Sequence, residues 1–295
     1  MFARRRFNQF LLEWLTQEKI PFNLELRKNN QGHDLRVLTA NQGYGDTVIY
    51  LHGMGDDLFF PGSLILKHLI EHGFEILTFD LNGHGKNSNS VLDIGTFRNF
   101  FAENKHLIPH KKTNKKLFFI GHSLGGALAL YAEAKGHIKA DGIVAIGCPY
   151  SLKKPGLHNL ASEVLHSCSL ETLMLLKQFS LLDLLPAVGG FKRSEYPIRL
   201  KHPKLEKLDY IEVISEIFSS LQPNDKNSNS PVLMISGDKD SIAPPSNCQK
   251  WATNFQNFQH VKISKLSHFG LTLHFDSHVT ITSWLNGIGK TRIIC

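Results

Sequence analysis

Short apolar runs alternate along this chain with segments in which apolar residues recur at helical spacing. The runs lack a helical period, as do strands buried on both faces of a sheet, and they cover residues 47–51, 75–81, 117–120, 142–147, 232–236 and 261–263. Helices are predicted between them, at residues 61–72, 91–107, 126–132, 244–255 and 273–285. This alternation predicts an α/β fold with a doubly wound, mostly parallel sheet, whose ligand site lies at the carboxyl ends of the strands.

The first forty residues depart from this alternation. Residues 24–27 and 35–38 alternate apolar and polar side chains on either side of a polar turn, so we predict an antiparallel hairpin at the sheet edge. Residues 1–20 are predicted to form an amphipathic helix, because one face gathers Phe7, Phe10, Leu11, Trp14 and Leu15. We expect this helix to pack on the body of the protein, with an anchor to a membrane surface as the alternative.

Residues 151–230 also break the alternation. They contain leucine-rich helical patterns at 157–179 and 205–221 but no β-rich run, and they end in the polar stretch 224–231. Since they lie between two predicted core strands, we interpret them as a helical cap inserted over the strand ends. The chain then divides into a core formed by residues 1–150 and 231–295 and a cap formed by residues 151–230.

The composition is that of a soluble globular protein, with 42% hydrophobic and 20% charged residues. The net charge of +7 comes from scattered Lys and Arg, which favours a solvated surface over a nucleic-acid site and leaves weak contact with a membrane surface as an alternative. Asn8, Gln9 and Glu13 interrupt the apolar part of the N-terminus, which argues against a signal peptide. The four Cys have no metal-ligand spacing, so we expect free thiols, no metal or other cofactor, and a cytoplasmic location.

Residues 121–125 read Gly-His-Ser-Leu-Gly and join a buried strand to a run of good helix formers. A serine on so tight a turn holds strained backbone angles, and the residues two before and two after it must lack side chains. Gly121 and Gly125 meet this requirement. The pattern indicates a nucleophile elbow that presents the Ser123 hydroxyl at a helix N-terminus, where a negatively charged oxygen is favoured.

A serine nucleophile needs a base and a carboxylate that orients the base, and in this kind of fold they follow in the order serine, acid, histidine. The strand at 232–236 runs into Gly-Asp-Lys-Asp, so Asp238 and Asp240 are both candidate acids. We favour Asp240, because Asp238 directly follows the turn glycine and is better placed to shape the loop. His268, on the loop between the last strand and the final helix, is the candidate base.

Two backbone N–H groups are candidates for stabilising an oxyanion. Leu124 follows the nucleophile, and Met54 lies in the loop His-Gly-Met-Gly after the first buried strand. The candidate substrate-binding residues adjoin these donors and the nucleophile: His52, Gly53 and His122.

Together these motifs resemble the α/β-hydrolase superfamily, and within it the branch that is similar to monoacylglycerol lipases and serine aminopeptidases. The resemblance spans about residues 45–290 and rests on motifs at 52–55, 80–88, 121–126, 237–244 and 268. It implies an α/β-hydrolase fold with a helical cap, the triad Ser123, Asp240 and His268, and the oxyanion donors Met54 and Leu124. Two positions depart from the family: Ser267 replaces the glycine before the catalytic histidine, and Leu81-Asn82 replaces the usual arginine of the Asp-x-Arg-Gly-His-Gly loop.

A serine nucleophile on this fold implies an acyl-enzyme, and the leading hypothesis is hydrolysis of a small, apolar carboxylic ester. The alternatives are a thioesterase, an acyltransferase, a catalytically silent binding protein, and an aminopeptidase that holds the substrate ammonium with Glu163, Glu171 or Asp183. The leucine-rich stretch at 165–185 is predicted either to line an acyl pocket or to pack within the cap. The oligomeric state does not follow from the sequence.

Overall fold

A computed structural model describes residues 2–30, 32–87, 97–109, 114–151, 210–222 and 228–288 of the chain. Its elements in chain order are α1 (Phe2–Gln17), β1 (Phe22–Lys28), β2 (Asp34–Ala40), β3 (Thr47–Leu51), α2 (Ser63–Glu71), β4 (Glu75–Phe79), α4 (Phe100–Glu103), η1 (Lys105–Leu107), β5 (Leu117–His122), α5 (Leu124–Ala134), β6 (Gly142–Ile146), α9 (Tyr210–Ser220), β7 (Val232–Gly237), α10 (Ser246–Ala252), β8 (Phe258–Ile263), α11 (Gly270–Leu273) and α12 (Phe275–Gly287).

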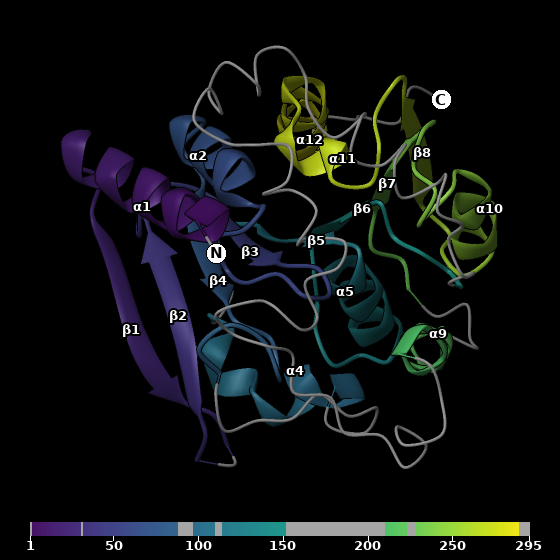
Figure 1. The fold of residues 1–295 in the computed structure, drawn as a ribbon, viewed down its shortest axis with the longest axis horizontal. Helices are drawn as coiled ribbons and strands as arrows, with labels where there is room; N and C mark the ends of the chain where they lie inside the picture. The colour runs from purple at the N-terminus through teal and green to yellow at the C-terminus, as the bar shows by residue number, and fades with distance from the viewer. Residues whose placement is uncertain are drawn as a thin grey trace.

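An eight-stranded sheet lies at the centre, in the order β1-β2-β4-β3-β5-β6-β7-β8 (Figure 1). β1 and β2 form an antiparallel hairpin, β2 runs antiparallel to β4, and all other neighbours are parallel. Every residue of β3, β5, β6 and β7 is buried, as their continuous apolar runs predict for parallel strands covered on both faces. The predicted mostly parallel α/β sheet with an edge hairpin is confirmed.

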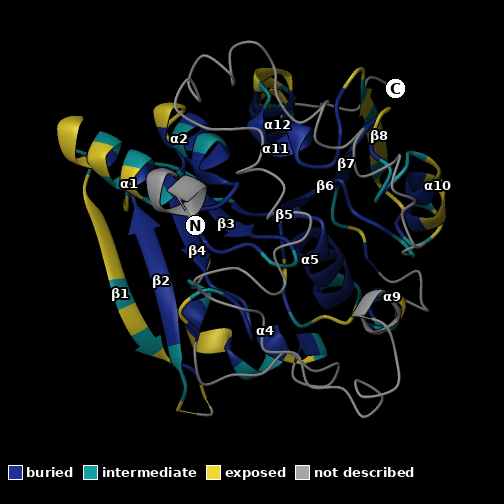
Figure 2. Cartoon of the chain, viewed as in Figure 1, coloured by how far each residue is buried: buried dark blue, intermediate teal, exposed yellow. Residues whose placement is uncertain are grey.

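Two layers of helices cover the sheet, because successive side chains of a strand point to opposite faces. In β5, Leu117 and Phe119 pack with α4, α5, α9 and α10, while Phe118 and Ile120 pack with α1, α2, α11 and α12. Figure 1 shows these two groups of helices on either side of the strands. Figure 2 shows the buried central strands, with exposed residues concentrated on β1 and on the outer faces of the helices.

Helix α1 lies against the body of the molecule. Leu11 and Leu15 are fully buried in the core that also contains α2, and the ring of Phe7 meets that of Phe60 edge to face at 5.2 Å. Among the described residues no helix is both long and apolar enough to cross a membrane.

Several predicted elements differ in their extent from the observed ones. The described part of the predicted helix 91–107 is broken at Asn99 and Asn104, where α4 gives way to a 3₁₀ turn. The side-chain amide and the backbone N–H of Asn104 both donate to the Phe100 carbonyl (2.8 and 3.0 Å), and α4 ends there. The last helix begins at Phe275 rather than 273, because His274 is extended and its Nδ1 accepts the N–H of Asp276. β8 begins at Phe258 rather than 261, since an edge strand also holds polar residues.

Most of the predicted cap, including its leucine-rich stretch, lies outside the described residues. Within the described part, α9 ends the segment, and Ile217, Phe218 and Leu221 are buried in the same core as α5. The division into core and cap stays a prediction.

Candidate active site

Ser123 lies at the sharp turn between β5 and α5, with backbone angles φ 52° and ψ −113°. A residue other than glycine in this region carries strain of about 1–3 kcal/mol, which the surrounding structure must offset. A Cβ on Gly121 would lie 2.3 Å from the backbone of Gly125, and a Cβ on Gly125 would lie 2.3 Å from the carbonyl oxygen of Leu51. The two glycines are therefore required for the turn, as the sequence pattern predicts.

His268 and Asp240 form a buried pair beside this turn. His268 Nδ1 lies 2.9 Å from Asp240 Oδ2, and both side chains are almost completely inaccessible to solvent. The other carboxylate oxygen of Asp240 accepts the N–H groups of Ile242 (3.0 Å) and Ala243 (2.6 Å). Because the carboxylate fixes the proton on Nδ1, Nε2 of His268 is the nitrogen that lacks a proton and can act as a base.

Asp238, the other candidate acid, does not contact His268. It is exposed, and its carboxylate accepts the N–H of Lys265 (2.5 Å) and the hydroxyl of Ser264 (3.4 Å). Lys265 has a positive φ of 64°, so Asp238 stabilises the turn that leads from β8 toward His268.

Gly147, which the sequence analysis did not single out, lies against this pair. It has a φ of +51°, and a Cβ at this position would lie 3.1 Å from His268 Nδ1 and 3.2 Å from Asp240 Oδ2. Its only sequence signal is its place at the end of β6, beside the strand that carries Ser123.

The two candidate oxyanion donors lie on the loop after β3 (Met54) and at the start of α5 (Leu124). Within the described part of the chain, neither the N–H of Met54 nor that of Leu124 donates a hydrogen bond. The loop that carries Met54 reaches the elbow, because a Cβ on Gly53 would lie 3.3 Å from the Cβ of Ser123. This close approach requires glycine at position 53.

His52, predicted to bind substrate, has both ring nitrogens in hydrogen bonds with the backbone. Nε2 accepts the N–H of Leu81 (2.9 Å), so Nδ1 carries the proton and donates to the carbonyl of Gly53 (2.8 Å). The ring thus fastens the loop after β3 to the end of β4, and neither nitrogen is left for a substrate.

His122, also predicted to bind substrate, is buried between two loops. Its Nε2 lies 3.3 Å from the carbonyl oxygen of His268, and its Nδ1 lies 3.5 Å from Asp56 Oδ2. Burial and the neighbouring His268 lower the pKa of His122, whereas the carboxylate of Asp56 acts in the opposite direction.

Arg36 and Asp80 form a buried, bidentate ion pair that sequence reasoning missed. Arg36 Nε and Nη2 lie 2.8 and 3.1 Å from the two carboxylate oxygens of Asp80, which also accept the N–H groups of Leu58 and Lys86. The alternating pattern of residues 35–38 placed Arg36 among the polar positions of an edge hairpin, yet it is buried. Arg36 thus places a guanidinium on the loop of residues 80–85, in which Asn82 replaces the arginine of the Asp-x-Arg-Gly-His-Gly motif.

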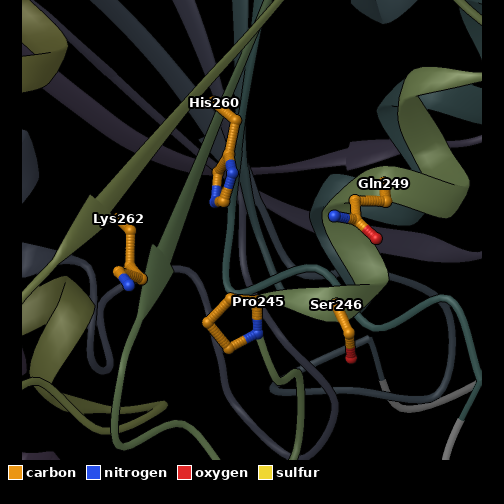
Figure 3. Close-up of a pocket in the computed structure, with 5 residues that line it drawn as sticks. All are labelled: Pro245, Ser246, Gln249, His260 and Lys262. Carbon is orange, nitrogen blue, oxygen red and sulfur yellow. The ribbon is translucent and has the colours of Figure 1, made fainter.

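The buried thiols are poor candidates for a nucleophile. Cys148 and Cys248 are free, and burial raises the pKa of both, that of Cys248 to about 11. The described residues hold no cluster of three or more His, Cys, Asp or Glu suited to a metal. A separate pocket between α10 and β8 contains none of the candidate catalytic residues; it is lined by Pro245, Ser246, Gln249, His260 and Lys262 (Figure 3).

Comparisons with known proteins agree with this architecture. The sequence model of the family described as "Serine aminopeptidase, S33" matches residues 45–193. Among solved structures, a serine hydrolase of the bacterium Cycloclasticus zankles is 12% identical with a TM-score of 0.67, over 91% of this chain and 99% of that one. An esterase of Pyrococcus furiosus is 16% identical with a TM-score of 0.59, over 92% of each chain. An esterase of Thermogutta terrifontis is 16% identical with a TM-score of 0.60, over 90% and 99%.

Proposed function

The chain belongs to the serine aminopeptidase S33 family of hydrolases with the α/β-hydrolase fold, and on this premise we propose that it hydrolyses a carboxylic ester through an acyl-enzyme on Ser123. The observation that carries the proposal is the buried contact between Asp240 and His268 beside a strained serine elbow. The esterases among the similar structures support the same bond type.

In the first half of the proposed reaction, Ser123 Oγ attacks the ester carbonyl while His268 Nε2 accepts the hydroxyl proton. Asp240 keeps the Nδ1 proton in place and stabilises the imidazolium that forms. The N–H groups of Met54 and Leu124 stabilise the oxyanion. The proton of the imidazolium then passes to the departing alcohol, which leaves the acyl group on Ser123.

In the second half, water replaces the alcohol. His268 removes a proton from the water as it attacks the acyl carbon, and then returns this proton to Ser123 Oγ. The products are the carboxylic acid and the free enzyme.

Covalent labelling tests the nucleophile. A fluorophosphonate probe should label the wild-type protein, and Ser123→Ala should abolish the labelling while the circular dichroism spectrum stays the same. Labelling that persists in the Ser123→Ala protein would transfer the role to another residue.

The family description favours an aminopeptidase as the second candidate function. The residues predicted to hold a substrate ammonium, Glu163, Glu171 and Asp183, lie outside the described residues. Turnover of p-nitrophenyl esters and of aminoacyl p-nitroanilides separates the two functions: we expect kcat/KM to be higher for the esters. A higher kcat/KM for the anilides than for the esters would assign the protein an aminopeptidase function.

The leucine-rich stretch at 165–185 leads us to propose a medium-chain acyl preference. Each buried CH₂ contributes about 0.8 kcal/mol, which is roughly three- to fourfold in kcat/KM. A series of p-nitrophenyl esters from acetate to laurate, below the critical micelle concentration, should therefore show kcat/KM rising until the pocket is filled. A steady fall from acetate onward would mean that these leucines only pack within the cap.

A further inference from the structure

The side chain of His122 lies where three loops of the proposed active site meet. Its backbone belongs to the serine elbow, its Nε2 faces the carbonyl of His268 at 3.3 Å, and its Nδ1 faces Asp56 Oδ2 at 3.5 Å. Asp56 is buried and lies on the loop after β3, which carries the candidate oxyanion donor Met54. The ring of His122 also packs on that of His268, with centroids 4.7 Å apart.

Gly53 brings these groups together. A Cβ on Gly53 would lie 2.6 Å from Asp56 Oδ2, 2.9 Å from His122 Nδ1 and 3.3 Å from the Cβ of Ser123. A shift of the His122 ring would therefore displace both Ser123 and the loop that carries Met54.

The protons of this pair follow from the donors and acceptors around it. His268 offers a carbonyl and Asp56 a carboxylate, and both are acceptors, whereas a neutral imidazole has a single N–H to donate. With the N–H on Nε2, Nδ1 and Asp56 Oδ2 would face each other as two buried acceptors without another hydrogen-bond partner in the described structure. One proton held between Asp56 and Nδ1 removes this conflict and keeps the N–H of Nε2 on the His268 carbonyl.

We propose that His122 is a positioning residue, which holds the catalytic-histidine loop through Nε2–H and the oxyanion loop through a proton shared between Nδ1 and Asp56. This rests on the proposed function, because it acts through His268 and Met54. The other ionisable groups close to the pair are Asp240 and His268 beside His122, and Tyr50 beside Asp56.

Kinetics on three variants test the role. His122→Phe keeps a planar ring but removes both ring nitrogens, and Asp56→Ala removes the partner of Nδ1. Misplacing reacting groups by about 1 Å can cost 10²-fold, so we expect both to lower kcat by about 10- to 100-fold with KM changed less than threefold. Asp56→Asn, whose amide can donate to Nδ1, should recover most of the kcat lost in Asp56→Ala.

The matched control is His278→Phe. His278 is also buried, and its Nε2 also hydrogen-bonds a backbone carbonyl, that of Thr272 at 2.9 Å. This variant should lose stability but keep kcat. A kcat of His122→Phe within twofold of wild type, or a loss confined to KM, would overturn the proposal.

Nitrogen-15 NMR of the histidine rings gives a readout that does not depend on activity. It is recorded on the Ser123→Ala protein, with the His122 signal identified by comparison with His122→Phe, or by sequential assignment if that variant does not fold. We expect Nε2 of His122 to be protonated at pH 7, and an unprotonated Nε2 would contradict the role. Absence of fluorophosphonate labelling in the wild type would count against the proposed function but not against the role of His122. An unprotonated Nε2 of His122 would count against that role alone, so the two failures are distinguishable.

Discussion

Asp238 and Asp240 are two residues apart in one loop, yet their surroundings differ completely. Asp240 is buried and holds His268 Nδ1 with one oxygen and two backbone N–H groups with the other. Asp238 is exposed and holds the backbone of Lys265. An orienting carboxylate must be fixed relative to the imidazole, and of these two aspartates only Asp240 has this arrangement.

We predict that Asp240→Asn lowers kcat by about 10⁴-fold, because an amide in this place favours the wrong imidazole tautomer, as in a serine-protease triad. Asp238→Asn, the matched control, should lower kcat by less than about tenfold. Steady-state kinetics on a p-nitrophenyl ester measure both, and the reverse ranking would assign the orienting role to Asp238.

Gly147 offers a second test at a single residue. At a φ of +51° any other residue costs about 1–2 kcal/mol, and a Cβ would also press on His268 Nδ1 and Asp240 Oδ2. We predict that Gly147→Ala lowers both the free energy of unfolding and kcat. Gly136→Ala is the control: its φ is +70° with nothing within 4 Å of the added Cβ, so it should lose similar stability and keep kcat. Equal kcat values for the two variants would show that Gly147 serves only the backbone.

The sequence could predict the residues whose roles follow from a local pattern, but not those whose roles depend on contacts. The elbow around Ser123 is local, and the positions of Asp240 and His268 follow from the strand order. Arg36 and Gly147 have no local pattern of this kind, because Asp80 lies 44 residues from Arg36, and His268 and Asp240 lie even farther along the chain from Gly147.

At the level of elements, α2 and α12 meet through a group of histidines. The ring of His68 lies 4.1 Å from that of His72 and 5.6 Å from that of His278, and its Nε2 lies 3.3 Å from the hydroxyl of Thr282. Burial lowers the pKa of His68, and it lowers the pKa of His278 to about 4. The remaining charged groups around them are Lys67, Glu71, His274 and Asp276.

We predict that acid weakens this contact. His278 is neutral when folded and binds a proton near pH 6.5 when unfolded, so its contribution is complete above pH 6.5 and is lost as the pH falls toward about 4. The loss should approach roughly 3 kcal/mol, on the order of 1.4 kcal/mol per pKa unit. The free energy of unfolding, measured with urea at pH 7.5 and pH 4.5, should fall less between these two pH values for His278→Gln than for the wild type. Equal drops would place the acid sensitivity elsewhere.

The elements themselves differ in how well the sequence predicted them. Buried parallel strands are apolar along their whole length, so β3, β5, β6 and β7 were predicted within a residue or two. The break in the segment 97–107 was missed, because Asn99 and Asn104 lie inside a pattern that predicts one continuous helix.

The whole molecule joins an antiparallel hairpin to a parallel sheet, and one ion pair fastens the junction. Arg36 comes from β2, Asp80 follows β4, and Asp80 also binds the N–H of Leu58 on the loop after β3. The side chain of Asp80 is fully buried. Gly85 packs so closely on it that a Cβ at this position would lie 2.1 Å from the carboxyl carbon of Asp80. The hairpin is therefore tied to the loops that carry the proposed active site.

Breaking this pair should destabilise the whole fold. Removing one partner of a buried ion pair leaves an uncompensated charge and costs about 3–5 kcal/mol, so we predict a loss of this size in the free energy of unfolding for Arg36→Met. Arg36→Lys should recover little of it, because an ammonium cannot bind the carboxylate through two parallel N–H groups.

Arg27→Met is the matched control for Arg36→Met. Arg27 lies on the neighbouring strand β1 and pairs with Glu25, but both side chains are more than a third exposed, so its loss should cost less than about 1 kcal/mol. Urea unfolding of the three variants and the wild type measures the difference. If the free energies of unfolding of Arg36→Met and Arg27→Met lie within about 1 kcal/mol of each other, solvent or repacking compensates the charge of Asp80. The junction would then be held by apolar packing alone.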